Sequence, residues 1–369
     1  MKSLKVIVSG GGTGGHIFPA ISIANEIKAI VPHAEFLFVG AEGKMEMEKV
    51  PAAGYKIIGL WISGLQRKLT FSNLLFPFKV IASTIKARKI IQEFKPDIVI
   101  GTGGYASGPT LRAAVALGIP TLIQEQNSYP GITNKLLSKK VNLICVGYEG
   151  MEKFFPANKL KLTGNPVRQD LVQTESKKEE AYSLFNLSRE KKTILVIGGS
   201  LGARTINQAI NSALPQIIQN NLQLIWQTGK SYFDTAKQHN ISSEVNGIKI
   251  FEFISRMDLA YAAADLIISR AGASSVSELA LVGKPCILVP SPNVAEDHQT
   301  KNAHALVNKQ AAVLVKDADA MKNLIPTAID LMNNSTMCEA LRQNISQLAF
   351  KNASRDIAHE ILKLTGYKL

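Results

Sequence analysis

The residues best suited to chemistry lie near the start of the chain, where five glycines occupy six positions ahead of a histidine. Gly10–Gly15 follow the uncharged β-branched run Val6–Val8 and precede His16. Glycine lets bare backbone approach a ligand, and the amides at a helix N-terminus favour negative charge. The pattern predicts a strand, then a glycine turn that binds a bulky anion, then a helix that opens at Pro19 and stops at Pro32.

The same glycines match the dinucleotide-binding fingerprint G-x-G-x-x-G through Gly10, Gly12 and Gly15. That fingerprint also requires an acidic residue at the end of the second strand, which binds a ribose. Here the strand-like run Phe36–Val39 ends in Gly40-Ala41. A nicotinamide cofactor is therefore disfavoured.

Three further glycine-rich turns follow apolar runs along the chain. They are Gly101–Pro109, Gly198–Arg204 and Arg270–Glu278. Four such turns fit a phosphate-rich ligand better than a simple hydrolase. In the last turn, Ser274 and Ser275 are expected to cap a helix. Glu278 is then either a capping carboxylate in the first turn of that helix or a ligand contact.

Strand-like and helical runs alternate throughout, which predicts a parallel α/β architecture. The expected strands are 6–8, 36–39, 56–60, 98–101, 121–124 and 143–146 in the first half, and 194–197, 222–226, 249–251, 266–269, 286–289 and 312–315 in the second. The second half begins with another strand–glycine–helix start, so we expect two Rossmann-like domains with a deep cleft between them, onto which both sets of strand ends face.

The domain boundaries follow from a break in the pattern. We expect a first domain over 1–166, a second over 167–341, and a helix over about 342–369 that packs back on the first domain. The length of 369 residues favours two domains over one core.

Composition bounds the class of protein. With 46% apolar and 19% charged residues, the chain is a folded protein. The net charge of +13 predicts an acidic lipid, a nucleic acid or a polyanionic small molecule as partner, unless it only reflects a lysine-rich lineage. Cys145, Cys286 and Cys338 have no metal-binding spacing, which favours a reducing compartment. We expect neither a signal peptide nor a membrane-spanning segment.

A membrane-surface anchor is expected within residues 67–95, which hold seven Lys or Arg side chains against one acidic residue, Glu93. The candidate anchor residues are Leu74, Leu75, Phe76, Lys79, Lys86 and Lys89, with Lys135, Lys139 and Lys140 extending the basic rim. The alternative is that Leu74 and Phe78 pack in the core among solvated lysines. No nucleic-acid recognition motif supports a nucleic-acid partner.

Six motifs in order along the chain carry a resemblance to a known family. They are Gly11–His16, Gly103–Pro109, Glu125–Asn127, Gly164–Arg168, Gly198–Ser200 and Glu296–Gln299. Over essentially the whole chain they resemble the MurG family, the peptidoglycan N-acetylglucosaminyltransferases of glycosyltransferase family 28. The resemblance implies an α/β GT-B fold and no cofactor.

The activity that the resemblance implies is inverting, metal-independent transfer of N-acetylglucosamine from UDP-N-acetylglucosamine (UDP-GlcNAc). The acceptor would be the C4 hydroxyl of muramoyl-pentapeptide on undecaprenyl diphosphate (lipid I), and the product lipid II. The resemblance also implies a peripheral enzyme on the cytoplasmic face of the bacterial plasma membrane. Its further partners would be the anionic membrane surface and other cell-wall synthesis or division proteins.

Site residues follow from the same resemblance. In the second domain it implies Glu278 at the ribose, the backbone of Ile254 at the uracil, Gln299 and Asn302 at the sugar hydroxyls, and Arg168, Ser200, Ala273, Ser274, Ser275, Val276 and Ser277 at the diphosphate or sugar. In the first domain it implies Thr13, Gly14, Gly15, Gly103, Gly104, Tyr105 and Asn127 near the acceptor diphosphate or the donor sugar.

The chemistry of glycosyl transfer agrees with these residues. The acceptor hydroxyl needs a base, and the leaving UDP needs a cation or dipoles. His16 is the candidate base because imidazole titrates in the useful range; the alternative is that it only orients a substrate or caps a helix. Asp317-Ala-Asp319 resembles a metal-binding acidic pair, but it precedes a helix near Ala320, so capping is preferred and no metal is expected.

Other readings of the same residues remain open at this point. A UDP-sugar epimerase or a diacylglycerol glucosyltransferase would share the fold. A non-catalytic nucleotide-sugar-binding module at the membrane would share the donor site but release no UDP.

Overall fold

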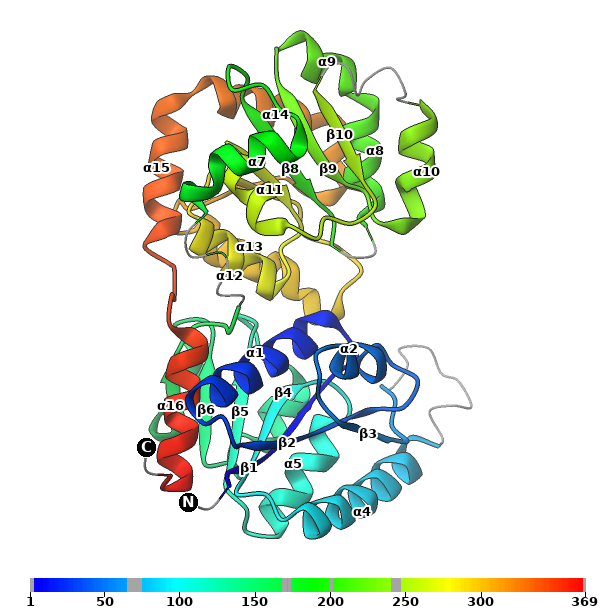
Figure 1. The fold of residues 1–369 in the computed structure, drawn as a ribbon, viewed down its shortest axis with the longest axis vertical. Coiled ribbons are helices and arrows are strands. Elements are labelled where there is room, and N and C mark those ends of the chain that lie inside the picture. The colour runs from blue at the N-terminus through cyan, green and yellow to red at the C-terminus, as the bar shows by residue number, and fades with distance from the viewer. Residues whose placement is uncertain are drawn as a thin grey trace. The chain divides into compact units, whose positions relative to one another are not determined.

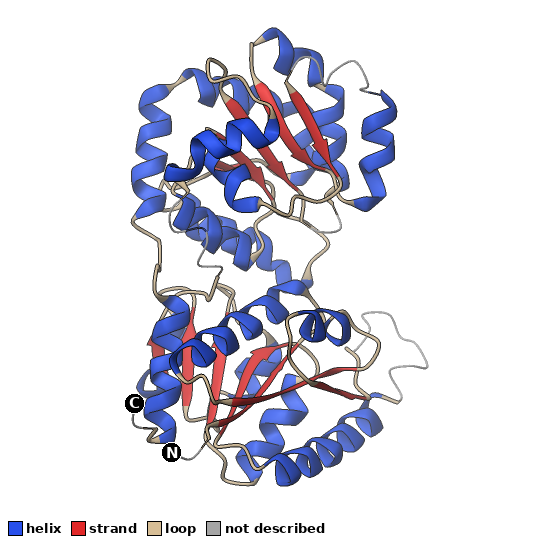
Figure 2. Ribbon diagram, in the orientation of Figure 1, coloured by secondary structure: helices blue, strands red, loops and turns tan. Residues whose placement is uncertain are grey.

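The computed structural model of the protein describes residues 3–64, 75–167, 171, 174–199, 202–239 and 247–367. The chain divides into two compact units: unit 1 is Met1–Val167 with Asn352–Leu369, and unit 2 is Arg168–Lys351. Each unit has a parallel sheet with helices on its faces (Figures 1 and 2). None of the helices in the described part of the chain combines the length and apolar character needed to cross a membrane.

The sheet of unit 1 has seven strands in the order β3-β2-β1-β4-β5-β6-β7. They are β1 (Lys5–Gly10), β2 (Glu35–Ala41), β3 (Ile57–Leu60), β4 (Ile98–Gly103), β5 (Thr121–Glu125), β6 (Leu143–Val146) and β7 (Leu160–Leu162). The order of strands reverses between β1 and β4, and ligands of open α/β sheets bind beyond the carboxyl ends of strands at such a point. The loops that follow β1 and β4 therefore form the expected ligand edge of unit 1.

Helices cover both faces of this sheet. They are α1 (Gly14–Ile30), α2 (Glu46–Ala52), α4 (Phe76–Phe94), α5 (Ser107–Ala116), α6 (Ile132–Leu137) and α16 (Ala353–Thr365), with short 3-10 turns η1 (Met151–Lys153) and η2 (Ala157–Lys159). Alternate residues of β1 enter two different cores, because side chains of a strand point to opposite faces. Val6 and Val8 pack with α1 and α16, whereas Ile7 packs with α4 and α5. Figure 1 shows α16 beside α1.

The sheet of unit 2 has six strands in the order β10-β9-β8-β11-β12-β13. They are β8 (Thr193–Ile197), β9 (Gln223–Gln227), β10 (Ile248–Phe251), β11 (Leu266–Ser269), β12 (Cys286–Leu288) and β13 (Val313–Leu314). Here the order reverses between β8 and β11. The loops after these two strands are the expected ligand edge of unit 2.

Unit 2 is helix-rich. Its helices are α7 (Lys178–Phe185), α8 (Arg204–Ser212), α9 (Leu214–Gln219), α10 (Lys230–His239), α11 (Met257–Ala263), α12 (Ala273–Val282), α13 (His298–Val307), α14 (Ala320–Asn333) and α15 (Ser335–Ser346), with 3-10 turns η4 (Glu175–Lys177), η6 (Ala295–Asp297) and η7 (Asp317–Asp319). One continuous core joins β8, β9 and β11 to α8 and α14.

Three elements differ from those expected from the sequence. The first helix begins at Gly14, five residues before Pro19, which it accepts in its second turn at the cost of one backbone hydrogen bond. The C-terminal tail forms two helices, α15 and α16. Leu341 of α15 packs in the core of unit 2 and Ile345 is buried in the same unit, whereas Ile357 of α16 packs in the core of unit 1. Strand β7 was not expected.

Candidate functional site

The glycine loop of unit 1 is held from beneath by a buried carboxylate. Glu46 of α2 has no exposed surface; its Oε2 accepts a hydrogen bond from the Gly12 amide at 2.9 Å, and its Oε1 accepts one from the Ala41 amide at 2.9 Å. Gly12 has a φ of 84°, which favours glycine. A side chain at Gly11 would collide with Glu46. The Gly12 amide therefore donates to Glu46 and does not point toward a ligand.

The amides that remain for a ligand are those at the start of α1. The Gly11 amide donates to the carbonyl of Gly103. Thr13 is the N-cap residue, and its side chain makes no capping hydrogen bond. The first amides of a helix have no intrahelical acceptor, so Thr13, Gly14 and Gly15 present donors beyond the helix end. The sequence predicted an anion site over the whole glycine run. In the structure, the candidate donors of that site are the amides of these three residues.

His16 lies in the first turn of α1 and faces the second glycine loop. Its Nδ1 lies 3.0 Å from the carbonyl oxygen of Gly11 and 3.3 Å from Oγ1 of Thr13. A Cβ built on Gly103, where φ is 96°, would lie 3.1 Å from Nε2 of His16. The N-cap residue of α1 is Thr13, so His16 lies inside the first turn of the helix.

The second glycine loop, Gly103–Tyr105, connects β4 to α5 and touches the first. A Cβ on Gly104 would lie 2.1 Å from the Gly11 carbonyl oxygen, so the backbones approach each other too closely for any side chain. Oγ1 of Thr102 donates to the carbonyl of His16 at 2.8 Å. The structure therefore brings Thr13–His16 and Gly103–Tyr105 together at the switch point of unit 1.

Asn127 belongs to a third loop of the same edge, shaped by the buried Glu125. One carboxylate oxygen of Glu125 accepts from the amide and the side chain of Asn127, at 3.0 and 3.2 Å. The other accepts from the Gly131 amide at 3.1 Å and from Nδ2 of Asn134 at 2.8 Å. Glu125 thus fixes the turn after β5 and the orientation of Asn127.

In unit 2, the loop that carries Ile254 is tied to the glycine loop after β8. The Ile254 amide donates to Oε1 of Gln227 at 2.9 Å, and Nε2 of Gln227 donates to the Gly199 carbonyl at 3.3 Å. Because its amide is engaged, Ile254 offers a ligand its carbonyl group. Gln227 was not singled out in the sequence, because a polar residue at the end of a strand carries no distinctive signal.

The buried carboxylate of Asp258 anchors the far end of the Ile254 loop through ion pairs. Asp258 at the start of α11 accepts two hydrogen bonds from the Arg256 guanidinium, each of 3.0 Å, and one from Lys177 at 2.8 Å. The Arg256 hydrogen bonds, with Lys177, hold the pKa of the Asp258 carboxyl well below its usual range. The loop from Ile254 to Arg256 is therefore fastened at both ends.

Glu278 lies in the second turn of α12, not the first, so the capping alternative is excluded. The hydroxyl of Tyr261 donates to its Oε2 at 3.1 Å. The N-cap residue is Gly272 and no side chain caps the helix, so the prediction that Ser274 and Ser275 cap it is wrong: both lie inside the first turn. The first-turn amides of α12 are consequently donors without an intrahelical acceptor.

The remaining donor-site candidates have distinct positions. On α13, Oε1 of Gln299 accepts from the Ser291 amide at 2.9 Å, which leaves its Nε2 as a donor for a ligand. Asn302 is fully buried, and its Nδ2 lies 3.3 Å from the Ala271 carbonyl. Asn302 therefore supports the turn before α12. Arg168 and Ser200 lie outside the described residues.

The Asp-x-Asp pattern before α14 has a different use from the one expected. Asp317 forms an ion pair with Arg270 and accepts from Oγ1 of Thr205 at 2.9 Å. Asp319 is the N-cap residue, but its side chain makes no capping hydrogen bond. The capping prediction is therefore wrong for both side chains. Across the described ranges, no three His, Cys, Asp or Glu side chains are grouped as metal ligands.

Comparison with known proteins identifies the family. The N-terminal domain of glycosyltransferase family 28 matches residues 6–146, and the C-terminal domain matches 193–361. The chain belongs to glycosyltransferase family 28. A relative from Flavobacterium psychrophilum is 58% identical over 364 residues, 99% of this chain and 98% of the relative. One from Parabacteroides distasonis is 58% identical over 368 residues, 100% of both. Both are named UDP-N-acetylglucosamine--N-acetylmuramyl-(pentapeptide) pyrophosphoryl-undecaprenol N-acetylglucosamine transferase.

Solved structures agree with this family. The crystal structure of Acinetobacter baumannii MurG has a TM-score of 0.78 and 28% identity, covering 98% of this chain and 100% of that one. A UDP-GlcNAc 2-epimerase from Neisseria meningitidis bound to UDP-GlcNAc has a TM-score of 0.68 at 18% identity, covering 98% and 100%. The second likeness shows the fold alone. Because both halves of the chain match glycosyltransferase family 28, the alternative of a nicotinamide-dependent oxidoreductase is rejected.

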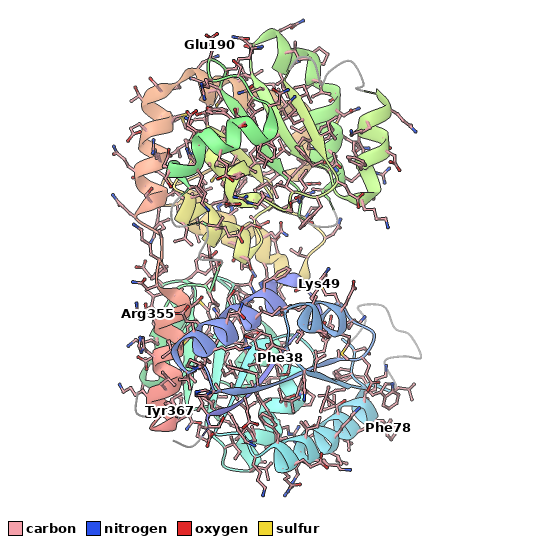
Figure 3. The ribbon with its side chains drawn as sticks, in the orientation of Figure 1. Phe38, Lys49, Phe78, Glu190, Arg355 and Tyr367 are labelled. Carbon is pink, nitrogen blue, oxygen red and sulfur yellow. The ribbon has the colours of Figure 1, made fainter. Side chains whose placement is uncertain are left out.

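The chain carries exposed apolar side chains on α4 and α6. Phe78 is 66% exposed and lies at the outer edge of α4 (Figure 3), so the alternative that it packs in the core is wrong. Leu75 is also exposed, whereas Phe76 is partly buried. Leu136 on α6 is 74% exposed. Leu74 lies outside the described residues.

The basic residues expected beside this apolar surface have different surroundings. Lys79 donates to Oγ of Ser63 at 3.0 Å, and Lys86 pairs with Glu42 at 3.0 Å. The expected members Lys89, Lys139 and Lys140 are exposed, and Lys89 lies 3.8 Å from Glu93. Charge is therefore partly neutralised on α4, while Lys139 and Lys140 follow α6 as exposed cations.

Proposed function

We propose that the protein transfers N-acetylglucosamine from UDP-GlcNAc to the C4 hydroxyl of lipid I and forms lipid II. The observation that carries this proposal is the 58% identity, over both units, with relatives named for this transfer. The loops at the two switch points support it, because each unit has glycine turns and uncapped helix amides suited to a diphosphate.

Unit 2 is the proposed donor site. Uracil has an N–H between two carbonyl groups, so it can donate to the carbonyl of Ile254. The carboxylate of Glu278 can accept hydrogen bonds from the ribose hydroxyls, and Nε2 of Gln299 can donate to the sugar. The first-turn amides of α12, at Ala273–Ser275, face the diphosphate, with Arg168 and Ser200 as further contacts from the family resemblance.

Unit 1 is the proposed acceptor site. Thr13, Gly14 and Gly15 supply amide donors to the acceptor diphosphate, and the Gly103–Tyr105 loop supplies bare backbone beside them. The side chain of Asn127, oriented by Glu125, lies on the next loop of the same edge. Amide donors without a fixed charge suit a substrate that must be released after each turnover.

His16 is the proposed base. Its Nε2 takes the proton of the acceptor C4 hydroxyl as that oxygen bonds to C1 of N-acetylglucosamine. The bond between C1 and the diphosphate oxygen breaks, and UDP leaves with the electron pair. The N-terminal amides of α12 stabilise the charge that develops on UDP. A single displacement of this kind inverts the configuration at C1, and it needs no metal, as the family resemblance implies.

UDP release with different acceptors tests this proposal. The full chain is incubated with UDP-GlcNAc and a short-chain lipid I analogue, with diacylglycerol, or with no acceptor. We expect UDP release only with the lipid I analogue. Release with diacylglycerol would indicate a different lipid acceptor, and no release with any acceptor would indicate a non-catalytic binding module.

We also propose that the protein binds peripherally to the cytoplasmic face of the bacterial plasma membrane, where a lipid-linked acceptor of this class resides. The exposed apolar side chains of α4 and α6 support this, since such side chains insert at a bilayer surface while lysines meet anionic lipid. Partners among cell-wall synthesis or division proteins would meet it there.

A further inference from the structure

A cavity of about 480 Å³ lies in unit 1 among α4, α5 and α6. Its walls include Phe76 and Val80 of α4, Pro109 of α5, and Leu136 and Leu137 of α6. Binding sites for small molecules are mostly apolar and enclose roughly 300–1,000 Å³. The size and the lining of this cavity therefore suit an apolar ligand, and nothing in the proposed transfer yet uses it.

The acceptor loop contributes Tyr105 to the lining of the cavity. Tyr105 lines the cavity and directly follows Gly103 and Gly104. Its ring covers Gly64, where a Cβ would lie 2.3 Å from Cζ of the tyrosine. Gly108, in the first turn of α5, also lines this part. A ligand bound in the cavity thus ends beside the backbone proposed to bind the acceptor diphosphate.

Two cations also line the cavity. Arg112 lies one turn further along α5 than Gly108, a rise of about 6 Å, and Lys140 follows the end of α6. Both side chains line the cavity and both residues are exposed. The lining of the cavity therefore combines the residue that follows the glycine loop, apolar walls, and two cations whose residues are exposed at the protein surface.

This combination of features matches one kind of amphiphile. A polyprenyl diphosphate has its anion joined directly to a branched apolar chain, so its anion can lie at the glycine loop while its first carbons lie in the cavity. An acyl chain of a membrane lipid would enter in the opposite sense, from Arg112 and Lys140. Its apolar end would then lie against the polar backbone near Tyr105, which costs desolvation.

We propose that this cavity binds the isoprenoid units of the acceptor nearest the diphosphate, and that the chain leaves between Arg112 and Lys140 toward the anionic membrane surface. This inference rests on the proposed function and adds that the enzyme binds the lipid part of the acceptor as well as its sugar and diphosphate. Burial of several carbons should lower the acceptor KM by at least about tenfold.

The chain-length dependence of KM tests the cavity. Lipid I analogues with one or four isoprenoid units are compared in solution without phospholipid. Wild-type protein should have a KM at least about tenfold lower for the four-unit acceptor. Val80→Trp fills the cavity and should bring the two KM values together. The matched control is Ala82→Trp, exposed on the same helix and absent from the lining, which should keep the wild-type ratio.

A binding measurement separates this inference from the transferase assignment. Calorimetry with geranylgeranyl diphosphate and with inorganic diphosphate should give at least about tenfold tighter binding of the former, lost in Val80→Trp. That result without any sugar transfer would support the cavity and contradict the proposed function. Normal transfer with equal KM for both chain lengths would support the proposed function and contradict the cavity assignment.

The chain-length dependence of KM also decides two further outcomes: a Val80→Trp variant that does not fold, and substitutions that affect only vesicle binding. If Val80→Trp does not fold, Thr84→Phe, on the next turn of α4 in the cavity lining, replaces it with the same expected result. If the substitutions weaken only binding to phosphatidylglycerol vesicles and leave the chain-length dependence intact, the cavity takes a membrane-lipid acyl chain. The isoprenoid assignment is then wrong.

Discussion

The Nδ1 atom of His16 lies 3.0 Å from the carbonyl oxygen of Gly11 in the same loop. Because a carbonyl oxygen only accepts hydrogen bonds, the neutral ring carries its proton on Nδ1 and its lone pair on Nε2. When Nε2 takes a proton, the same carbonyl oxygen stabilises the imidazolium, and the ring stays oriented. The glycine loop thus contributes to the proposed base as well as to anion binding.

Removal of the imidazole should slow transfer without affecting the donor. We expect His16→Ala to lower kcat by about two to four orders of magnitude, the usual range for general base catalysis. The affinity for UDP, measured by calorimetry, should stay within about twofold of wild type, a change of about 0.4 kcal/mol in binding free energy. The control is His33→Ala, an exposed histidine beyond the end of α1. Near-normal turnover of His16→Ala would leave His16 only an orienting role.

The carboxylate beneath the glycine loop offers a second test. In Glu46→Gln the amide group faces one of two backbone donors, Gly12 or Ala41, with an N–H where an oxygen is needed. A buried donor left without an acceptor costs about 1–3 kcal/mol, so the free energy of unfolding should fall by that amount. We also expect a lower kcat with unchanged UDP affinity, since the loop loses its support.

The matched control for this change is Glu48→Gln on the same helix, where the side chain is exposed. It should leave both urea unfolding and kcat as in wild type. If the two substitutions behave alike, the hydrogen bonds of Glu46 do not position the loop.

Glu278 tests the assignment of unit 2 to the donor. Hydrogen bonds to a charged group contribute about 1.5–3 kcal/mol, so Glu278→Ala should raise the dissociation constant of UDP by about 10- to 150-fold. Tyr261→Phe keeps the carboxylate and removes the 3.1 Å hydrogen bond from the Tyr261 hydroxyl, so it should have a much smaller effect. Unchanged UDP affinity in Glu278→Ala, with impaired acceptor kinetics, would mean that the roles of the two units are reversed.

Membrane binding should separate into two terms. Each lysine near an anionic surface contributes about 1 kcal/mol that fades with salt, and each buried Leu or Phe about 1.5–3 kcal/mol that does not. In vesicle sedimentation, Leu75→Ser with Phe78→Ser should remove the salt-resistant part. Lys139→Gln with Lys140→Gln should remove mainly the salt-sensitive part.

The control for this experiment is Leu184→Ser, an exposed leucine of unit 2. It should not change vesicle binding. Binding that survives both double substitutions would place the anchor elsewhere on unit 1.

The strands were predictable from the sequence because strands of a parallel sheet are buried on both faces and form uncharged apolar runs. Ile194–Ile197 and Leu266–Ser269 are of this kind, and both are strands. Strand β7 has only three residues and includes Lys161, so it has no such run. The glycine turns were predictable because each follows a strand.

The supports of the site were not predictable, because they depend on contacts between distant residues. Glu46 reaches Gly12 from 34 positions along the chain, and nothing near Glu46 in the sequence indicates it. Asp317 has the local pattern of a helix cap, yet it pairs with Arg270, 47 positions earlier. In such cases tertiary partners decide the role of a carboxylate.

Analysis of the reaction product tests the transferase assignment most directly. The full chain is incubated with UDP-GlcNAc radiolabelled in the sugar and a short-chain lipid I analogue, with a chelator present. We predict one labelled lipid product, in which N-acetylglucosamine is β-linked to C4 of the muramoyl sugar, and one UDP released for each product formed. UDP release without a labelled disaccharide, or an α linkage in the product, would contradict the assignment.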